Sequence, residues 1–265
     1  MLLFDARLRG AGIRAIDLEN LAFFGVAGVV ITPPTGRPAA GPEEVLARFD
    51  AILGPDRARV QAAGMQAFCV LGVHPSWAPP RGMHKVLHRM PEYLCRPGVV
   101  GVGEIGLKDG TPPELDLLER HLELAEAHDL PVVIHLAAAD RVRLTSLVLD
   151  RLLNSRFPLD RVLVAQVGPD TLELVKAAGV RVGVSVGAEP VARAAAVQLL
   201  QEHGPDGVIV DGGVGEGAAD LLSMPKAAEE LAAGGWSVDE VQRVFRDNAA
   251  GFFGVSVAPG PVPTP

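Results

Sequence analysis

Short apolar segments alternate with longer segments of helical periodicity along nearly the whole chain, and this rhythm constrains the fold more than any other feature. Apolar runs of about four to eight residues that are bounded by Gly or Pro are typical of buried strands. The predicted strands cover residues 2–6, 26–32, 66–73, 99–104, 131–135, 161–166, 180–186 and 207–211. About eight such strands, alternating with helices over about 250 residues, predict a (β/α)8 TIM barrel.

The segments between the predicted strands have the pattern of amphipathic helices. In residues 112–128, apolar side chains recur three and four positions apart, so that they share one helix face. The other predicted helices cover residues 16–24, 42–63, 82–94, 140–154, 169–178, 190–202, 218–233 and 238–253. A doubly wound open sheet is the alternative fold, but no GxGxxG follows the first strand, which disfavours its nucleotide-binding form.

We therefore expect one TIM-barrel domain over residues 1–255 and a Pro-rich, disordered tail over residues 256–265, which end in VAPGPVPTP. With 48% hydrophobic residues, the chain can bury a sizeable core. Its net charge of -8 argues against general affinity for nucleic acid, which favours a basic surface, and leaves room for a small local basic site.

The sequence also bears on the compartment. Cys69 and Cys95 are the only cysteines, and neither belongs to a CxxC pair, so we expect packed thiols in a reducing compartment. No apolar run reaches the roughly 18 residues that a membrane span requires, and no charged-then-apolar leader opens the chain. We expect a cytoplasmic protein with no membrane association.

Polar residues stand where the predicted strands stop, and Glu104 stands at the end of the short apolar run that begins at Val99. The set consists of Asp5, Arg7, Arg9, His74, Glu104, His135, Gln166 and Asp211. Because the carboxyl ends of barrel strands meet at one mouth, we expect these side chains to converge there. Two histidines and several acids are a typical donor set for a divalent metal ion.

Each of these residues also has an ordinary structural explanation. Arg7 and Arg9 could simply pair with nearby acids, His135 could bond to backbone in the core, and His74 could cap its loop. The histidines inside predicted helices, including His121, are expected to lie on the surface.

The order of these segments resembles the TatD-type metal-dependent hydrolases of the amidohydrolase superfamily, from residue 2 to about residue 254. The motifs that carry the resemblance are GVHP at 72–75, GEIGL at 103–107, PVVIH at 131–135 and NAAGFFG at 248–254. The resemblance implies a TIM barrel whose mouth holds metal ions and hydrolyses phosphoesters such as DNA.

The metal ligands that the resemblance implies are mostly replaced in this chain. The family's first strand ends in His-x-His, whereas Arg7 and Arg9 stand at those positions here. The family's Glu and its fifth-strand His are present as Glu104 and His135, but Gln166 replaces the next histidine.

The position of the family's last ligand, an Asp after the eighth strand, has two readings. If Asp211 matches the acid that precedes this ligand, the ligand position falls on Gly213, which the following VGEGAAD favours. A shift of the alignment would make Asp211 itself the ligand.

Arginine stays protonated and has no lone pair to give a metal. Two guanidinium groups would also repel a dication by several kcal/mol at a separation of about 4 to 5 Å. We therefore expect no cofactor, and if any metal binds, Glu104 and His135 would be its ligands. We expect at least one guanidinium to bond Glu104 in the ion's place, with Asp5 or Asp211 as a further acceptor.

Three functions fit these observations, so enzymatic activity stays open. The favoured one is a non-catalytic TatD-like barrel that binds or assembles with an unknown protein partner. The first alternative is an active phosphoester hydrolase whose one-metal site for Zn, Mg or Mn adds His74 or Asp211 to the surviving ligands. The second is a barrel in which Arg7 and Arg9 hold a small anionic ligand.

Overall fold

The structure is a computed structural model that describes residues 1–10, 12–78, 81–137, 139–187, 192–215 and 219–258. Its centre is an 8-stranded parallel sheet in the order β1 to β8. The strands are β1 Leu3–Leu8, β2 Val26–Ile31, β3 Gln66–Leu71, β4 Val99–Leu107, β5 Val132–Leu136, β6 Val162–Val164, β7 Arg181–Ser185 and β8 Val208–Asp211. Each strand pairs with its neighbour in the sequence, as in a (β/α)8 barrel.

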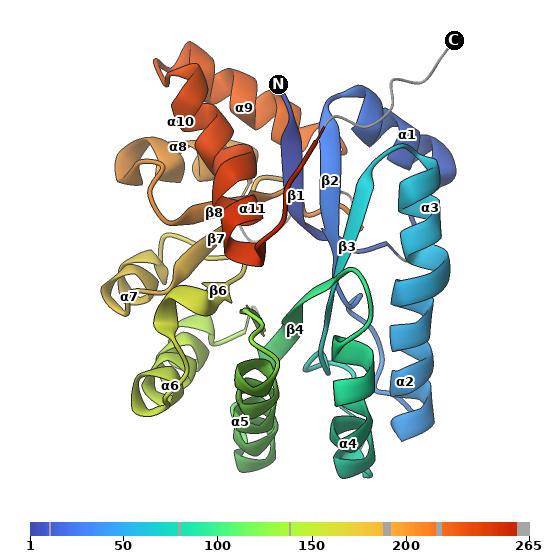
Figure 1. Ribbon diagram of the computed structural model, residues 1–265. Coiled ribbons are helices and arrows are strands. Elements are labelled where there is room, and N and C mark those ends of the chain that lie inside the picture. The colour runs from blue at the N-terminus through green and yellow to red at the C-terminus, as the bar shows by residue number, and fades with distance from the viewer. Residues whose placement is uncertain (11, 79–80, 138, 188–191, 216–218, 259–265) are drawn as a thin grey trace.

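The two edges of this sheet meet, so that it curls into a nearly closed barrel (Figure 1). The Gly212 amide after β8 donates to Asp5 Oδ1 of β1 at 3.2 Å. The Arg9 amide after β1 donates to the Val214 carbonyl at 3.0 Å. The TIM barrel predicted from the sequence is therefore confirmed, and the open-sheet alternative is wrong.

Helices surround the barrel (Figure 1). They are α1 Ala15–Phe23, α2 Pro42–Ala51, α3 Arg57–Ala62, α4 Met83–Leu94, α5 Pro112–Ala127, α6 Arg141–Asn154, α7 Leu172–Ala177, α8 Arg193–His203, α9 Ser223–Ala233, α10 Val238–Gln242 and α11 Asn248–Phe253. Short helical turns η1 Ile52–Asp56, η2 Leu159–Arg161 and η3 Arg243–Asp247 complete them. Within the described residues, no helix is both long and apolar enough to cross a membrane.

Two helices predicted as continuous contain a wider π turn. The helix over 42–63 passes through η1, where Pro55 has no N–H to donate to the preceding turn. The helix over 238–253 passes through η3. Helix α9 begins at Ser223 rather than near residue 218, which lies outside the described residues, as do the start predicted for α8 and tail residues 259–265.

Apolar side chains pack in two layers, because successive residues of a strand point to opposite faces. One layer lies between the strands and the helices and includes Val132 and Leu118. The other fills the barrel interior and includes Phe4, Val133 and Phe253. Phe253 comes from α11 and contacts Phe4 edge-to-face at 6.5 Å between ring centroids, so α11 covers the amino-terminal end of the barrel.

Candidate functional site

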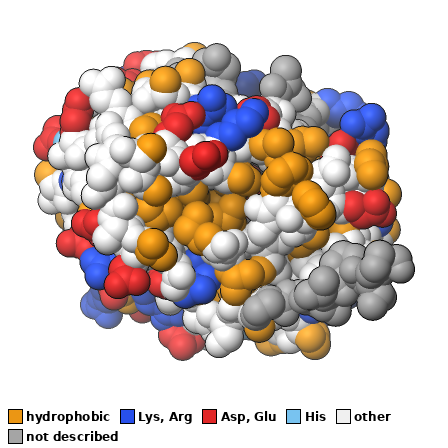
Figure 2. Space-filling model, turned by 90° about the horizontal axis from the view of Figure 1, so that it is seen from above, with side chains coloured by type: hydrophobic (Ala, Val, Ile, Leu, Met, Phe, Trp, Pro, Cys, Tyr) orange, Lys and Arg blue, Asp and Glu red, His pale blue; other side chains and the backbone are white. Residues whose placement is uncertain are grey.

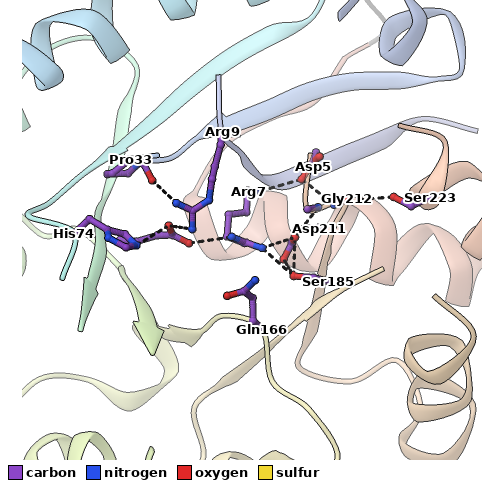
Figure 3. Close-up of polar contacts among 12 residues, drawn as sticks. Asp5, Arg7, Arg9, Pro33, His74, Gln166, Ser185, Asp211, Gly212 and Ser223 are labelled. Carbon is purple, nitrogen blue, oxygen red and sulfur yellow. Dashed lines mark hydrogen bonds and ion pairs between the residues drawn. The ribbon is translucent and has the colours of Figure 1, made fainter. Parts of the chain in front are cut away.

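Glu104 is buried between two arginines, Arg7 of β1 and Arg9 just after it. Figure 3 shows how Arg7 and Arg9 reach into the barrel from that strand. Arg9 Nη2 lies 2.8 Å from Oε2 of Glu104, and Arg7 Nη1 lies 3.4 Å from Oε1. The Glu104 side chain is 0% exposed, and the two arginines are 2% exposed or less. Burial by itself raises the pKa of Glu104, but Arg9 and Arg7 outweigh it and hold that pKa below its usual range. Both carboxylate oxygens of Glu104 therefore face a guanidinium group.

Arg7 links Glu104 of β4 to a second acid on β8. Its Nη2 donates to Ser185 Oγ at 3.0 Å and to Asp211 Oδ1 at 3.2 Å. The Ser185 hydroxyl lies 2.8 Å from that same Asp211 oxygen. Arg9 in turn donates from Nη1 to the Pro33 carbonyl at 2.9 Å. Arg7 thus joins two acids on opposite sides of the barrel, Glu104 and Asp211. The guanidinium group of Arg9 is held against the chain just after β2.

Asp5 accepts backbone N–H groups in this structure. Its Oδ1 accepts from the amides of Arg7, at 3.0 Å, and Gly212, at 3.2 Å. The sequence suggested Asp5 or Asp211 as a further acceptor for an arginine side chain. The structure shows this contact between Arg7 and Asp211. Burial, together with the nearby Asp211, raises the pKa of Asp5 from 3.8 to about 7. Asp5 is consequently an acid that titrates close to neutral pH.

His74, Glu104 and His135 converge, and their ligand atoms all lie within 4.8 Å of one another. The imidazole rings of His74 and His135 are 4.7 Å apart between centroids. Among the described residues, this is the group that could hold one divalent ion.

The tautomer of His74 follows from its hydrogen bonds. The Ser76 backbone amide donates to His74 Nδ1 at 3.1 Å, so Nδ1 must be the accepting nitrogen. In neutral His74 the proton therefore lies on Nε2, which is 3.9 Å from Glu104 Oε2. Burial, then His135, lowers the pKa of His74 from 6.5 to about 3, so the ring is neutral at physiological pH.

The remaining positions at the strand ends behave differently from one another. Gln166 is buried, and its backbone has a left-handed conformation, at φ 56°. Its backbone carbonyl accepts a hydrogen bond from Arg141 Nη1. Of the two positions considered for the family's last ligand, Asp211 is the one with a side chain in the cluster, and the Gly213 amide donates to it at 2.9 Å.

The expectation that His121 lies on the surface is wrong. His121 of α5 is 0% exposed, with Nδ1 2.7 Å from the Leu117 carbonyl and Nε2 accepting the Val73 amide at 3.1 Å. Burial lowers its pKa from 6.5 to about 4. The signal was present in the sequence, because His121 shares the helix face of Leu118 and Ala125. His121 thus holds the segment that leads into His74.

Ser185 and Arg141 were also missed from the sequence. Ser185 is the last residue of β7, a strand end like those singled out, but it lies inside an otherwise apolar run. Arg141 is the first residue of α6, and helical arginines are ordinarily solvated.

Comparison with known proteins finds sequences of the TatD type and of a metal-dependent hydrolase. Residues 56–157 match the model of the family described as TatD related DNase. A metal-dependent hydrolase of Methanocaldococcus jannaschii, itself uncharacterized, is 24% identical over 240 residues, which is 89% of this chain and 94% of the relative.

Solved structures extend the likeness to the whole barrel. The TatD-like protein of Archaeoglobus fulgidus has a TM-score of 0.82 at 25% identity, with 95% of this chain and 100% of that chain covered. The TatD homolog YJJV of Escherichia coli has a TM-score of 0.68 at 18% identity, covering 96% and 98%. The fold that these solved structures share with this chain is the TIM barrel. More narrowly, this chain is similar to TatD-like metal-dependent hydrolases, with a TatD-type segment over residues 56–157, and the resemblance seen in the sequence is confirmed.

Proposed function

We propose that this chain is a TatD-like barrel that has exchanged metal-dependent hydrolysis for a role in binding or assembly. The observation that carries this proposal is the pair of guanidinium groups, from Arg7 and Arg9, on the two oxygens of Glu104. We place this role in the cytoplasm, where reduced thiols such as those of Cys69 and Cys95 are the rule.

The donor chemistry of the site supports this proposal. A divalent ion on Glu104 would lie beside guanidinium groups that cannot lose their charge and would repel it. His74 presents a protonated Nε2 toward Glu104, and a nitrogen that carries a proton has no lone pair for a metal. The residues present therefore do not fit a divalent ion in the arrangement described, and no reaction step is assigned to one.

A one-metal hydrolase is the second candidate, because His74, Glu104 and His135 are close enough together for one ion. This function requires Arg9 to leave Glu104 and His74 to move its proton to Nδ1, at the expense of the Ser76 amide bond. Two rearrangements of buried groups stand between the described state and this function.

An anion site on Arg7 and Arg9 has less support. Both guanidinium groups already contact Glu104, and Arg7 also contacts Asp211. An added phosphate or carboxylate would have to compete with these buried carboxylates for the same N–H groups.

The test combines metal analysis of the purified protein with a phosphodiester hydrolysis assay in the presence of Mg²⁺, Mn²⁺ or Zn²⁺. We expect no rate above background in the wild-type protein or in Glu104→Ala. Glu123→Ala is the matched control, since Glu123 is an exposed glutamate on α5. A metal-dependent rate that disappears in Glu104→Ala and persists in Glu123→Ala would establish the one-metal hydrolase instead.

A further inference from the structure

A cavity of about 730 Å³ opens at the amino-terminal ends of the strands. Its lining includes Val99 at the start of β4, Pro131 just before β5 and Arg181 at the start of β7, with α11 on the other side. Glu104 lies toward the carboxyl end of β4, and the reactions of TIM barrels take place at that end. The cavity is therefore separate from the TatD-like site.

The floor of this cavity is apolar. Val100, Phe252, Phe253 and Val255 line it, and all of them belong to or pack on the apolar cluster inside the barrel. Figure 2 shows the face on which the N-terminus lies in Figure 1, with hydrophobic side chains gathered in its hollowed middle and charged side chains toward the edge. Ligand cavities of about 300 to 1,000 Å³ ordinarily combine such a floor with a few polar groups.

Most of the charges that line the cavity are already engaged. The guanidinium of Arg161 bonds both the carboxylate and the carbonyl of Asp129. Asp247 accepts from Arg246 Nε at 2.7 Å. Two lining groups differ, because the exposed side chains of Arg181 and Asp160 make no hydrogen bond or ion pair with the described part of the chain. The cavity thus offers one unengaged cation and one unengaged anion.

We propose that this cavity binds a small zwitterion with an apolar body, namely a short peptide with free termini. Its carboxylate would pair with Arg181 and its ammonium group with Asp160, while its apolar side chains cover Phe252 and Val100. A simple anion would leave Asp160 without a partner, and a simple cation would leave Arg181 without one. The site lies at the other end of the barrel, so it does not depend on the function proposed above.

The first test is calorimetric titration of the full chain with three probes. They are the dipeptide leucyl-phenylalanine, its N-acetyl derivative, which is an anion, and its C-terminal amide, which is a cation. We expect the free dipeptide to bind and each blocked derivative to bind at least about tenfold more weakly, since each lacks one charged contact. Absence of dipeptide binding, or equal binding of either derivative, would overturn the proposal.

The second test locates the binding. Arg181→Gln and Asp160→Asn should each weaken dipeptide binding about tenfold, without changing the binding of the derivative that lacks the corresponding partner. The matched controls are Arg81→Gln and Asp109→Asn, which alter exposed residues remote from the cavity lining. We expect both controls to bind like the wild type. Equal losses in the controls, or no loss in Arg181→Gln, would place the peptide elsewhere and contradict the assignment.

Discussion

Arg9 places its Nη2 2.8 Å from Oε2 of Glu104, with both side chains buried in the barrel. A metal ion in a TatD-like site would bring positive charge to this carboxylate, and here the chain's own side chain brings it. A guanidinium group cannot dissociate or activate water as a metal does. The pair therefore has a structural consequence that can be measured as stability.

Replacing Arg9 by Ala should destabilise the protein by about 3 to 5 kcal/mol, because it leaves a buried carboxylate without its closest counter-charge. The free energy of unfolding measured by urea titration checks this. A loss below about 1 kcal/mol would be the value of a solvated surface pair and would contradict the buried arrangement.

A double variant tests the same point with the charges removed together. Arg9→Met with Glu104→Gln should recover much of the stability that Arg9→Ala loses. In the double variant the buried carboxylate of Glu104 is replaced by a neutral amide, so it no longer needs the charge of Arg9. Surface pair Arg120 and Glu123 provides the comparison, where single and double changes should each stay within about 1 kcal/mol.

Asp5 should make the protein less stable as pH rises from about 4 to about 7. Its pKa is raised from 3.8 to about 7 in the folded state, so folding favours the protonated acid. This contribution is complete below pH 3.8 and is lost by about pH 7, a change of up to about 4 kcal/mol.

Asp5→Asn should remove this part of the pH dependence, since the Asn oxygen can still accept the Arg7 and Gly212 amides. Urea unfolding of both proteins at a series of pH values checks it, as the difference between them. A difference that does not vary between pH 4 and 7 would contradict the raised pKa.

His121 should have the opposite effect. Its pKa is lowered from 6.5 to about 4 by burial, so its contribution is intact above pH 6.5 and is lost as pH falls toward 4, by about 3 kcal/mol. His121→Gln should show a shallower loss of stability over this range than the wild type. The exposed His88 is the control, and His88→Gln should keep the wild-type profile.

Restoring the two histidines that the family resemblance implies should not restore hydrolysis. Arg7→His with Arg9→His returns two nitrogen donors to β1 and the residue just after it, but Gln166 still stands where the resemblance implies a further ligand. A metal-dependent phosphodiester rate in this double variant, assayed beside the wild type with Mn²⁺, would mean that the arginines alone block the activity.

The barrel could be predicted from the sequence because eight apolar segments and their intervening helices each have a local signature. Boundaries were less accurate where tertiary contacts decide them. Strand β1 runs on to Leu8, so Asp5 and Arg7 lie within it, and β4 runs past Glu104 to Leu107. In a sequence pattern, a polar residue is taken as the end of a strand. Here Asp5, Arg7 and Glu104 have polar partners inside the barrel, so the strands continue past them.

Within the site, the convergence of side chains followed from topology, since the carboxyl ends of barrel strands must meet. The partners of each side chain did not follow from it. That Arg7 would contact both Ser185 and Asp211, or that the Ser76 amide would fix the tautomer of His74, depends on distances that no sequence pattern contains.

The central claim is that guanidinium groups hold the place of the metal at Glu104. A crystal structure of the protein grown with Mn²⁺, with anomalous data at the barrel mouth, tests it most directly. We predict an Arg9–Glu104 separation near 2.8 Å and no anomalous peak. An ordered ion on Glu104 and His135, with Arg7 and Arg9 turned away from the carboxylate, would contradict the account.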